Sequence, residues 1–235
     1  IGDREAARRV AGSGAVLNQL QLDISDHTDL HQIVATVPGV YFRQEDGYGL
    51  RPNIGIRGAT TDRSQKITMM EDGILIGPAP YSAPAAYYVP NAARIHAVEI
   101  LKGPASIKYG PHTVGGAINF VTAPVPETNT TALDLSLGSD GYMKTQAEIG
   151  VRLNEQMGVL VDLMDYRSDG FKELDSGGGT GFQRNDFNIK FRWQPASSTP
   201  SMLTMKVGFA AEDSDETYLG LSDADFEANP DQRYA

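Results

Sequence analysis

The sequence predicts an α+β domain, with a small mixed sheet and short helices, followed by a run of antiparallel β-strands. The first half of the 235 residues is irregular and rich in Gly and Pro, whereas the second half alternates apolar and polar residues with period two. The change falls in a Pro-rich stretch at residues 122–127. We therefore expect a lead-in over residues 1–25, the α+β domain over 26–124 and the strands over 125–235.

Composition excludes several classes of protein. With 20 basic and 30 acidic residues the net charge is −10, so nucleic acid is not an expected partner, because its binding depends on basic contacts to phosphate. The absence of cysteine removes disulfides, thiolate metal sites and cysteine nucleophiles. Neither a Gly-x-Ser-x-Gly elbow nor a phosphate loop is present, since Gly177-Gly-Gly179 is not followed by Lys-Ser/Thr. We do not expect an enzyme.

In the first half, apolar residues at helical spacing predict a helix over residues 26–37, capped by Asp26 or Thr28 and ended by Pro38-Gly39. A hairpin is expected where residues 67–70 and 74–76 flank Glu71-Asp-Gly73, because Asp-Gly supplies the positive φ angles of a tight turn. Further strands are expected over residues 53–57, 98–101 and 117–121.

Two groups of polar residues have structural interpretations. Glu71 and Asp72 are interpreted as turn residues rather than metal ligands. The four histidines lack the spacing of metal ligands and are interpreted as structural, with one in a loop as the best exception: His27, His31, His96 and, in the loop, His112. No metal site is therefore predicted.

Five segments of the second half alternate: residues 133–137, 147–153, 157–163, 187–193 and 203–209. With its flanks, each reaches the ~9–11 residues of a transmembrane strand. Long connections follow the third and fifth segments and short ones follow the second and fourth, as in outer-membrane barrels. A soluble β-sandwich also alternates, so alternation and loop length alone leave the two architectures equally open.

Four motifs of the first half occur in order: Asn53-Ile-Gly-Ile-Arg-Gly58, Met69-Met-Glu-Asp-Gly-Ile-Leu-Ile76, Val98-Glu-Ile-Leu-Lys-Gly-Pro-Ala-Ser-Ile-Lys-Tyr-Gly110 and Gly115-Gly-Ala-Ile-Asn-Phe-Val-Thr122. Together they resemble the plug domain of TonB-dependent outer-membrane transporters. The resemblance implies an α+β plug domain followed by antiparallel β-strands of an incomplete transmembrane β-barrel. Within that family, Ala79-Pro-Tyr81 and Tyr109-Gly-Pro111 are most similar to ferric citrate transporters.

The resemblance also implies a function. It implies active transport of a ferric chelate across the outer membrane of a Gram-negative cell, with the plug gating the barrel. The expected partners are a TonB-type energy-coupling protein in the periplasm, the iron chelate as cargo, and outer-membrane lipid. No permanently bound cofactor is expected. Two alternatives stay open: another cargo, such as cobalamin, a metal complex or a saccharide, or a receptor without transport.

Two plug segments, residues 41–52 and 77–90, are expected to face an external ligand. Guanidinium groups present a fork of donors to carboxylates, and phenols add contact area, so both suit an anionic, oxygen-rich chelate. The candidate ligand-binding residues are Arg43, Gln44, Tyr48, Arg51, Arg57, Tyr81, Ser82 and Tyr87. The likeness to ferric citrate transporters implies ligand contacts near Tyr48, Arg57 and the Tyr81-Ser82-Ala83 turn. The sequence departs from those transporters at Tyr48 and Ala83.

Other interpretations of these residues stay open. The alternative for Arg57 is an ion pair with a carboxylate of the barrel wall. The alternative for Arg43 and Arg51 is that they are solvated loop charges. Tyr87 has the alternative of packing between plug and barrel. The TonB box of the family is a short apolar stretch, which the charged residues 1–10 do not match, so we expect it to lie upstream.

Overall fold

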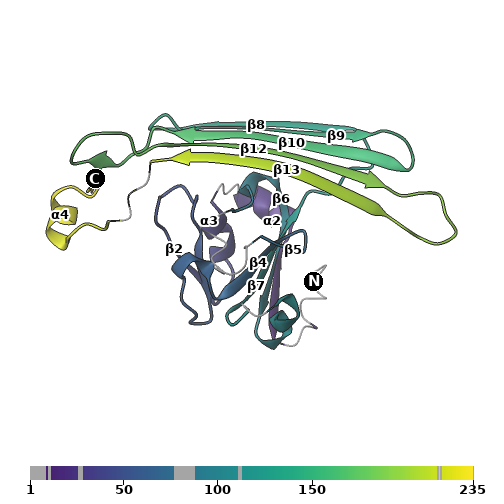
Figure 1. Ribbon diagram of the computed structural model, residues 1–235, viewed down its shortest axis with the longest axis horizontal. Coiled ribbons are helices and arrows are strands. Elements are labelled where there is room, and N and C mark those ends of the chain that lie inside the picture. The colour runs from purple at the N-terminus through teal and green to yellow at the C-terminus, as the bar shows by residue number, and fades with distance from the viewer. Residues whose placement is uncertain are drawn as a thin grey trace. The chain divides into compact units, whose positions relative to one another are not determined.

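The computed structural model describes residues 9, 12–25, 29–76, 88–110, 113–215, 217 and 219–234. The chain divides into two compact units, residues 1–123 and 124–235. Each unit is built on its own five-stranded sheet (Figure 1). The division falls within one residue of the change in sequence pattern at residue 124.

The first unit contains a mixed sheet with the strand order β1-β6-β7-β4-β5. Its strands are β1 (Ser13–Leu17), β4 (Ile67–Glu71), β5 (Ile74–Leu75), β6 (Ile95–Lys102) and β7 (Gly116–Thr122). Strands β4 and β7 pair in parallel, and the other neighbours are antiparallel. The small mixed sheet is therefore confirmed, and its last strand, β7, lies at its centre.

Short helices and a second, two-stranded sheet complete this unit. They are α2 (Gln19–Ser25), α3 (Leu30–Ala35), β2 (Val40–Arg43), β3 (Asn53–Ile56) and the 3-10 turns η1 (Asp62–Ser64), η3 (Ala92–Arg94) and η4 (Pro104–Tyr109). Leu30 and Val34 of α3 share one buried cluster with Ile54 of β3 and with Ile118 and Phe120 of β7. Among the described residues, no helix is long and apolar enough to cross a membrane.

The sequence predicted some of these elements better than others. The hairpin is confirmed, because Asp72 (φ 50°) and Gly73 (φ 81°) both adopt positive φ between β4 and β5. The predicted cap of α3 was wrong: the helix begins at Leu30, and the side chain of Asp29 accepts the His31 N–H. The segment expected to be a lead-in supplies the edge strand β1 and the helix α2.

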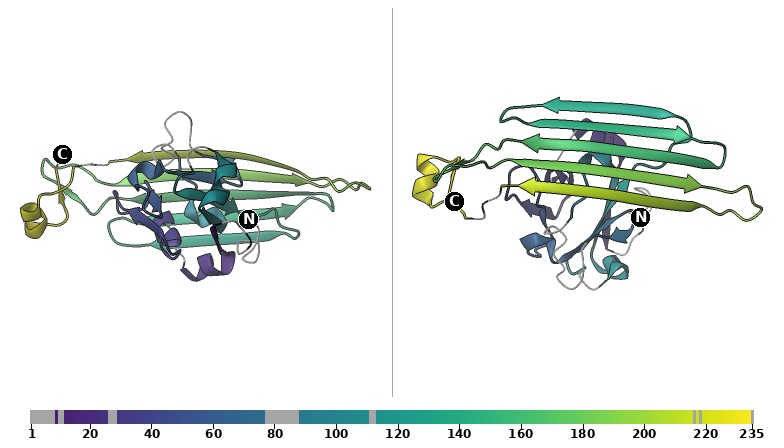
Figure 2. Two further views of the ribbon diagram at one scale, coloured as in Figure 1. Left: turned by 90° about the horizontal axis from the view of Figure 1, so that it is seen from below. Right: turned by 45° about the horizontal axis from the view of Figure 1, so that its top comes forward.

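The second unit is an antiparallel sheet with the order β13-β12-β10-β9-β8, so that each long strand pairs with the next one along the chain (Figure 2). Its strands are β8 (Thr130–Leu137), β9 (Met143–Arg152), β10 (Met157–Ser168), β12 (Phe182–Trp193) and β13 (Leu203–Ser214). All five predicted strands are confirmed.

Three short elements in the long connections had no counterpart in the prediction. They are β11 (Glu173–Leu174), α4 (Asp223–Ala228) and β14 (Gln232–Arg233). Strand β11 pairs in parallel with β14, and the Glu173 N–H donates to the Asp231 carbonyl at 2.8 Å. The two long connections are thus joined into one structured end of the sheet.

The two faces of this second sheet differ in chemistry. One face carries apolar residues, and the register aligns five of them in a row across the strands: Leu133, Ala147, Leu163, Phe187 and Phe209. The opposite face is charged, with Lys144 bound to Asp134 at 3.0 Å and Arg184 lying 3.7 Å from Glu212. The sheet therefore needs an apolar medium on one side and a polar one on the other.

The apolar residues run level across four of the five strands. From the row of Leu163, Phe187 and Phe209 they extend in one direction to Val159, Phe191 and Met205, which again lie opposite one another. In β9 Val151 belongs to this second row, whereas in β8 the apolar residues extend the other way, from Leu133 to Leu137.

Phe120 tests the packing of the first unit, because its side chain is fully buried in the central strand. We expect Phe120→Ala to lower the free energy of unfolding of this unit by about 3–5 kcal/mol, through lost burial and the cavity left behind. Leu75→Ala is the matched control, since Leu75 is 56% exposed, and its effect should stay within about 0.5 kcal/mol. Chemical denaturation of the whole protein measures both, and equal effects would contradict the assignment of the core.

Candidate functional site

The candidate site is the loop of residues 44–52, which joins strands β2 and β3. These strands pair antiparallel from Val40 opposite Ile56 to Arg43 opposite Asn53. The loop therefore leaves the domain at a fixed place, with Arg43 and Asn53 side by side at its base. It carries three of the predicted ligand-binding residues, and a fourth, Arg43, lies at its base.

The carboxylate of Asp46 organises this loop. Asp46 is 6% exposed, and its side chain accepts backbone N–H groups from Tyr48 at 2.5 Å, Leu50 at 3.2 Å and Arg51 at 3.0 Å. Such charge-assisted bonds to a carboxylate are about twice as strong as neutral ones. Asp46 was not predicted, although Asp-Gly at positions 46–47 is a turn signal that could have identified it.

The base of the loop is held by hydrogen bonds from both ends. The Gln44 side-chain amide donates to Asp29 Oδ2 at 3.4 Å. The Asn53 side-chain amide donates to the Arg51 carbonyl at 3.1 Å, and its oxygen accepts the Arg63 N–H at 2.8 Å. Buried polar groups anchored in this way leave the loop little freedom.

The structure brings four predicted residues together on this loop and at its base. Arg43 is 58% exposed at its side chain and pairs with Glu45 at 2.9 Å, while Arg51 Nη1 donates to the Leu50 carbonyl at 3.2 Å. Gln44 is exposed and Tyr48 is half-buried. The other three candidates from the second segment, Tyr81, Ser82 and Tyr87, lie outside the described residues.

Arg57 lies apart from these four, at the opposite end of the β2–β3 hairpin. Its N–H donates to the Gly39 carbonyl at 3.0 Å, and its guanidinium lies over Gly103, where a Cβ would be 3.0 Å from Nη1. Lys102 is next to it; this side chain is buried and donates to the Pro38 carbonyl at 2.7 Å. Burial and the charge of Arg57 lower the pKa of Lys102 below its ordinary value. In the described part of the chain, no carboxylate pairs with either cation.

Glu71 and Asp72 have structural partners. The Asp72 carboxylate accepts the Thr122 N–H at 2.8 Å and the Thr122 hydroxyl at 2.7 Å. Glu71 accepts from the Arg94 guanidinium at 2.9 Å and from the Tyr88 hydroxyl at 2.8 Å. Over the described ranges, no cluster of three His, Asp or Glu residues is placed to hold a metal ion.

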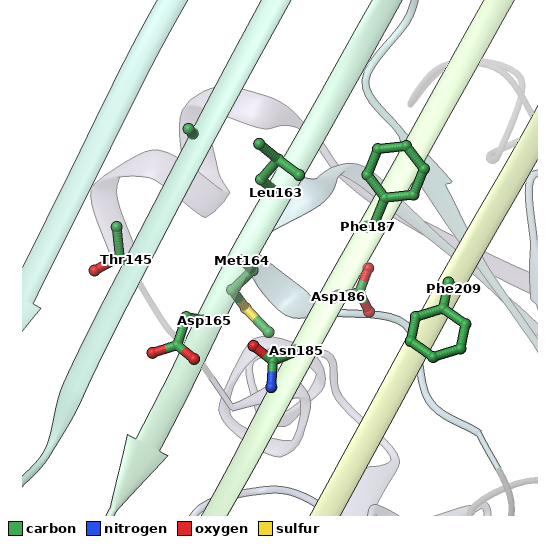
Figure 3. A pocket seen from close by; sticks show the side chains of 9 residues that line it. Thr145, Leu163, Met164, Asp165, Asn185, Asp186, Phe187 and Phe209 are labelled. Carbon is green, nitrogen blue, oxygen red and sulfur yellow. The ribbon is translucent and has the colours of Figure 1, made fainter.

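The second unit has a separate hollow of about 430 Å³ on its sheet (Figure 3). Ala147, Leu163, Phe187 and Phe209 line it, and they form the cross-strand row of the apolar face. Thr145, Asp165 and Asn185 also line it and form the next cross-strand row, so the hollow lies where the apolar face meets a polar row.

The comparisons with known proteins address the first unit directly. Residues 6–117 match the family described as TonB-dependent Receptor Plug Domain. This part of the chain is a TonB-dependent receptor plug domain. The loop of residues 44–52 is therefore a plug loop, and the second unit begins directly after the plug.

Relatives and solved structures extend the comparison beyond the plug. A vitamin B12 transporter, BtuB, from Vibrio vulnificus is 25% identical over 177 residues, which is 74% of this chain and 28% of that protein. BtuB of Photobacterium profundum is 25% identical over 157 residues, or 67% of this chain and 25% of that protein. The chain thus spans about a quarter of the curated relatives that it matches.

Solved structures share the fold of both units. The unliganded ferric citrate transporter FecA superposes with a TM-score of 0.79 over 98% of this chain and 35% of that one, at 20% identity. The ferric yersiniabactin receptor FyuA from Yersinia pestis gives 0.72 over 87% and 33%, also at 20% identity. The second unit is accordingly an incomplete barrel rather than a sandwich.

Removing the Asp46 carboxylate tests the order of the plug loop. We expect Asp46→Ala to leave three N–H groups without their acceptor and to lower the local stability of residues 46–51 by roughly 1–3 kcal/mol. Hydrogen exchange of the Tyr48, Leu50 and Arg51 amides measures this. Glu45→Gln, which weakens the ion pair with Arg43 and leaves the Asp46 carboxylate in place, should change the protection less.

Proposed function

We propose that this chain is the plug and first barrel strands of a TonB-dependent transporter that takes up a ferric chelate across the outer membrane of a Gram-negative cell. The observation that carries the proposal is the order of the parts. A plug domain is followed directly by an antiparallel sheet of long strands with one apolar and one charged face, as in transmembrane barrels. Similar plug-and-strand folds occur in receptors for several iron chelates.

The chemistry of the plug loop supports an anionic, oxygen-rich ligand. Arg43 and Arg51 provide guanidinium donors within one loop, and Gln44 and Tyr48 add an amide and a phenol. Because Asp46 fixes the backbone between them, these groups are positioned before a ligand arrives, which limits the entropy lost on binding. Iron enters as part of the cargo, with no resident cofactor in the plug.

A second cargo is favoured by a separate observation. The curated relatives are vitamin B12 transporters at 25% identity, whereas the likeness to FecA is one of fold at 20% identity. Cobalamin uptake is therefore the competing proposal. A receptor that binds without transporting is the third, and dependence on a TonB-type partner separates it from the other two.

The uptake test uses cells that express the whole protein in an energised strain and in a matched strain without TonB. We expect radiolabelled iron supplied as ferric citrate or as a hydroxamate chelate to accumulate only where TonB is present, because the plug has to be rearranged at the expense of energy. Uptake of labelled cobalamin without uptake of labelled iron would identify cobalamin as the cargo. Equal uptake in both strains would overturn active transport.

The double substitution Arg43→Ala with Arg51→Ala tests the predicted contacts. We expect the affinity for an anionic ferric chelate to fall about tenfold or more, since a hydrogen bond to a charged group contributes roughly 1.5–3 kcal/mol. Lys66→Ala is the matched control, because it removes one exposed basic residue outside the loop. Equal affinity of the double variant and the control, measured by titration of the purified protein, would remove these arginines from the site.

Arg57→Ala separates the two interpretations of that residue. If Arg57 pairs with a carboxylate outside the plug, its loss should reduce stability and leave chelate affinity unchanged. Its position at the far end of the β2–β3 hairpin favours this outcome. A loss of affinity equal to that of the double variant would return Arg57 to the ligand site.

A further inference from the structure

We propose that His31, held by Asp29, is the positioning residue of the plug loop: its neutral imidazole fixes residues 44–53, and its protonation releases them. The inference rests on the proposed function only in taking this loop as the ligand-binding one. His31 lies in α3, directly beneath the base of the loop, and its side chain is fully buried.

The hydrogen bonds define which nitrogen of the ring carries the proton. The Asn53 backbone N–H donates to His31 Nε2 at 3.0 Å, so Nε2 must present a lone pair. Nδ1 lies 2.9 Å from Asp29 Oδ1 in a poorly aligned contact, and a carboxylate at that distance requires a proton on Nδ1. The ring is therefore neutral, with its proton facing Asp29 and its acceptor facing the loop.

Asp29 links the same ring to the other end of the loop. Its carboxylate accepts the His31 backbone N–H at 2.7 Å and the Gln44 amide at 3.4 Å. Gly49 packs so closely above it that a Cβ there would lie 2.4 Å from Asp29 Oδ1. The Asp29–His31 pair thus contacts the start, the middle and the end of the loop.

Asp29 is ionised at neutral pH. Burial raises the pKa of its carboxyl, but hydrogen bonds from His31 and Gln44 outweigh this effect, so the pKa lies below its ordinary value. A carboxyl whose pKa is lowered on folding stays charged above its ordinary value, so Asp29 remains an acceptor for the His31 Nδ1–H.

Among the residues that the structure describes, the surroundings of the ring offer it no second acceptor for a new proton. Phe42 of β2 stacks on it with centroids 5.0 Å apart. The charged side chains of the neighbouring segments are Asp29 at the start of α3, Asp46 and Arg51 in the loop, and Arg63 in η1. Asp46 is committed to three loop amides, and Asp29 lies on the Nδ1 side.

Protonation at Nε2 would set two donors against each other. The new N–H would face the Asn53 N–H, and because the site is buried neither donor can turn to water. Asn53 would have to move, and its side chain bridges the Arg51 carbonyl and the Arg63 N–H. The end of the loop, with Arg51, would move with it.

The test compares two substitutions of His31, each of which keeps one of its two side-chain contacts. A glutamine at position 31 can present an acceptor to the Asn53 N–H and does not titrate, whereas an asparagine can contact Asp29 but does not reach Asn53. We measure hydrogen-exchange protection of residues 45–53, corrected for intrinsic rates, and affinity for ferric citrate in the whole protein, between about pH 5 and 8. His96→Gln is the matched control, because it removes a histidine of β6 outside this cluster.

In the wild type and in His96→Gln, protection of the loop should fall about fivefold to tenfold on acidification, the equivalent of losing roughly one buried hydrogen bond. His31→Gln should keep the protection at every pH, and His31→Asn should lack it at every pH. The same pH dependence in His31→Gln as in the wild type, or full protection in His31→Asn, would overturn the positioning role.

The two readouts separate this inference from the proposed function. If protection of the loop changes in the two His31 variants as expected but ferric citrate does not bind, the positioning role is supported. The same result counts against ferric citrate as the cargo. Affinity that falls in parallel with protection supports both. Hydrogen-exchange protection that is the same in the wild type and in both His31 variants overturns the role of His31, whatever the affinity for ferric citrate.

Discussion

The position of β7 is the constraint on which the plug depends. This strand is the last of the domain in sequence and the central one in its sheet, antiparallel to β6 and parallel to β4. It also carries Phe120 and Ile118, both fully buried. The sheet therefore cannot close until the whole domain is present, and the Asp72 carboxylate then fixes Thr122 at the exit to the barrel strands.

Local patterns predicted those elements that local chemistry determines. The Asp72-Gly73 turn and the five long strands follow from residues that are adjacent in sequence. The sequence did not indicate β1, because an edge strand of five residues gains its stability from pairing with β6, about 85 residues away. The β11–β14 contact likewise consists of two residues from each of two distant loops. The grouping of Arg43 with Arg51 was predictable, but the separation of Arg57 required the hairpin register.

The two-faced sheet explains why alternation alone was ambiguous. Alternation only states that one face is apolar, as in a sandwich or in a barrel. The register aligns Leu163, Phe187 and Phe209 in one straight row, which fits either architecture. The choice between them comes from the solved structures, whose fold matches both units of this chain.

Two cations, Lys102 and Arg57, lie together at the far end of the β2–β3 hairpin of the plug. Lys102 is buried beside Arg57, and both burial and that neighbour lower the pKa of its amine. A lysine whose pKa falls on folding weakens the folded state at neutral pH, an effect that disappears only above its unfolded pKa. The β2–β3 hairpin therefore has two different ends. At one end two cations lie close together and lower the stability of the fold, whereas at the other Asp46 and Asp29 accept hydrogen bonds from the loop and order it.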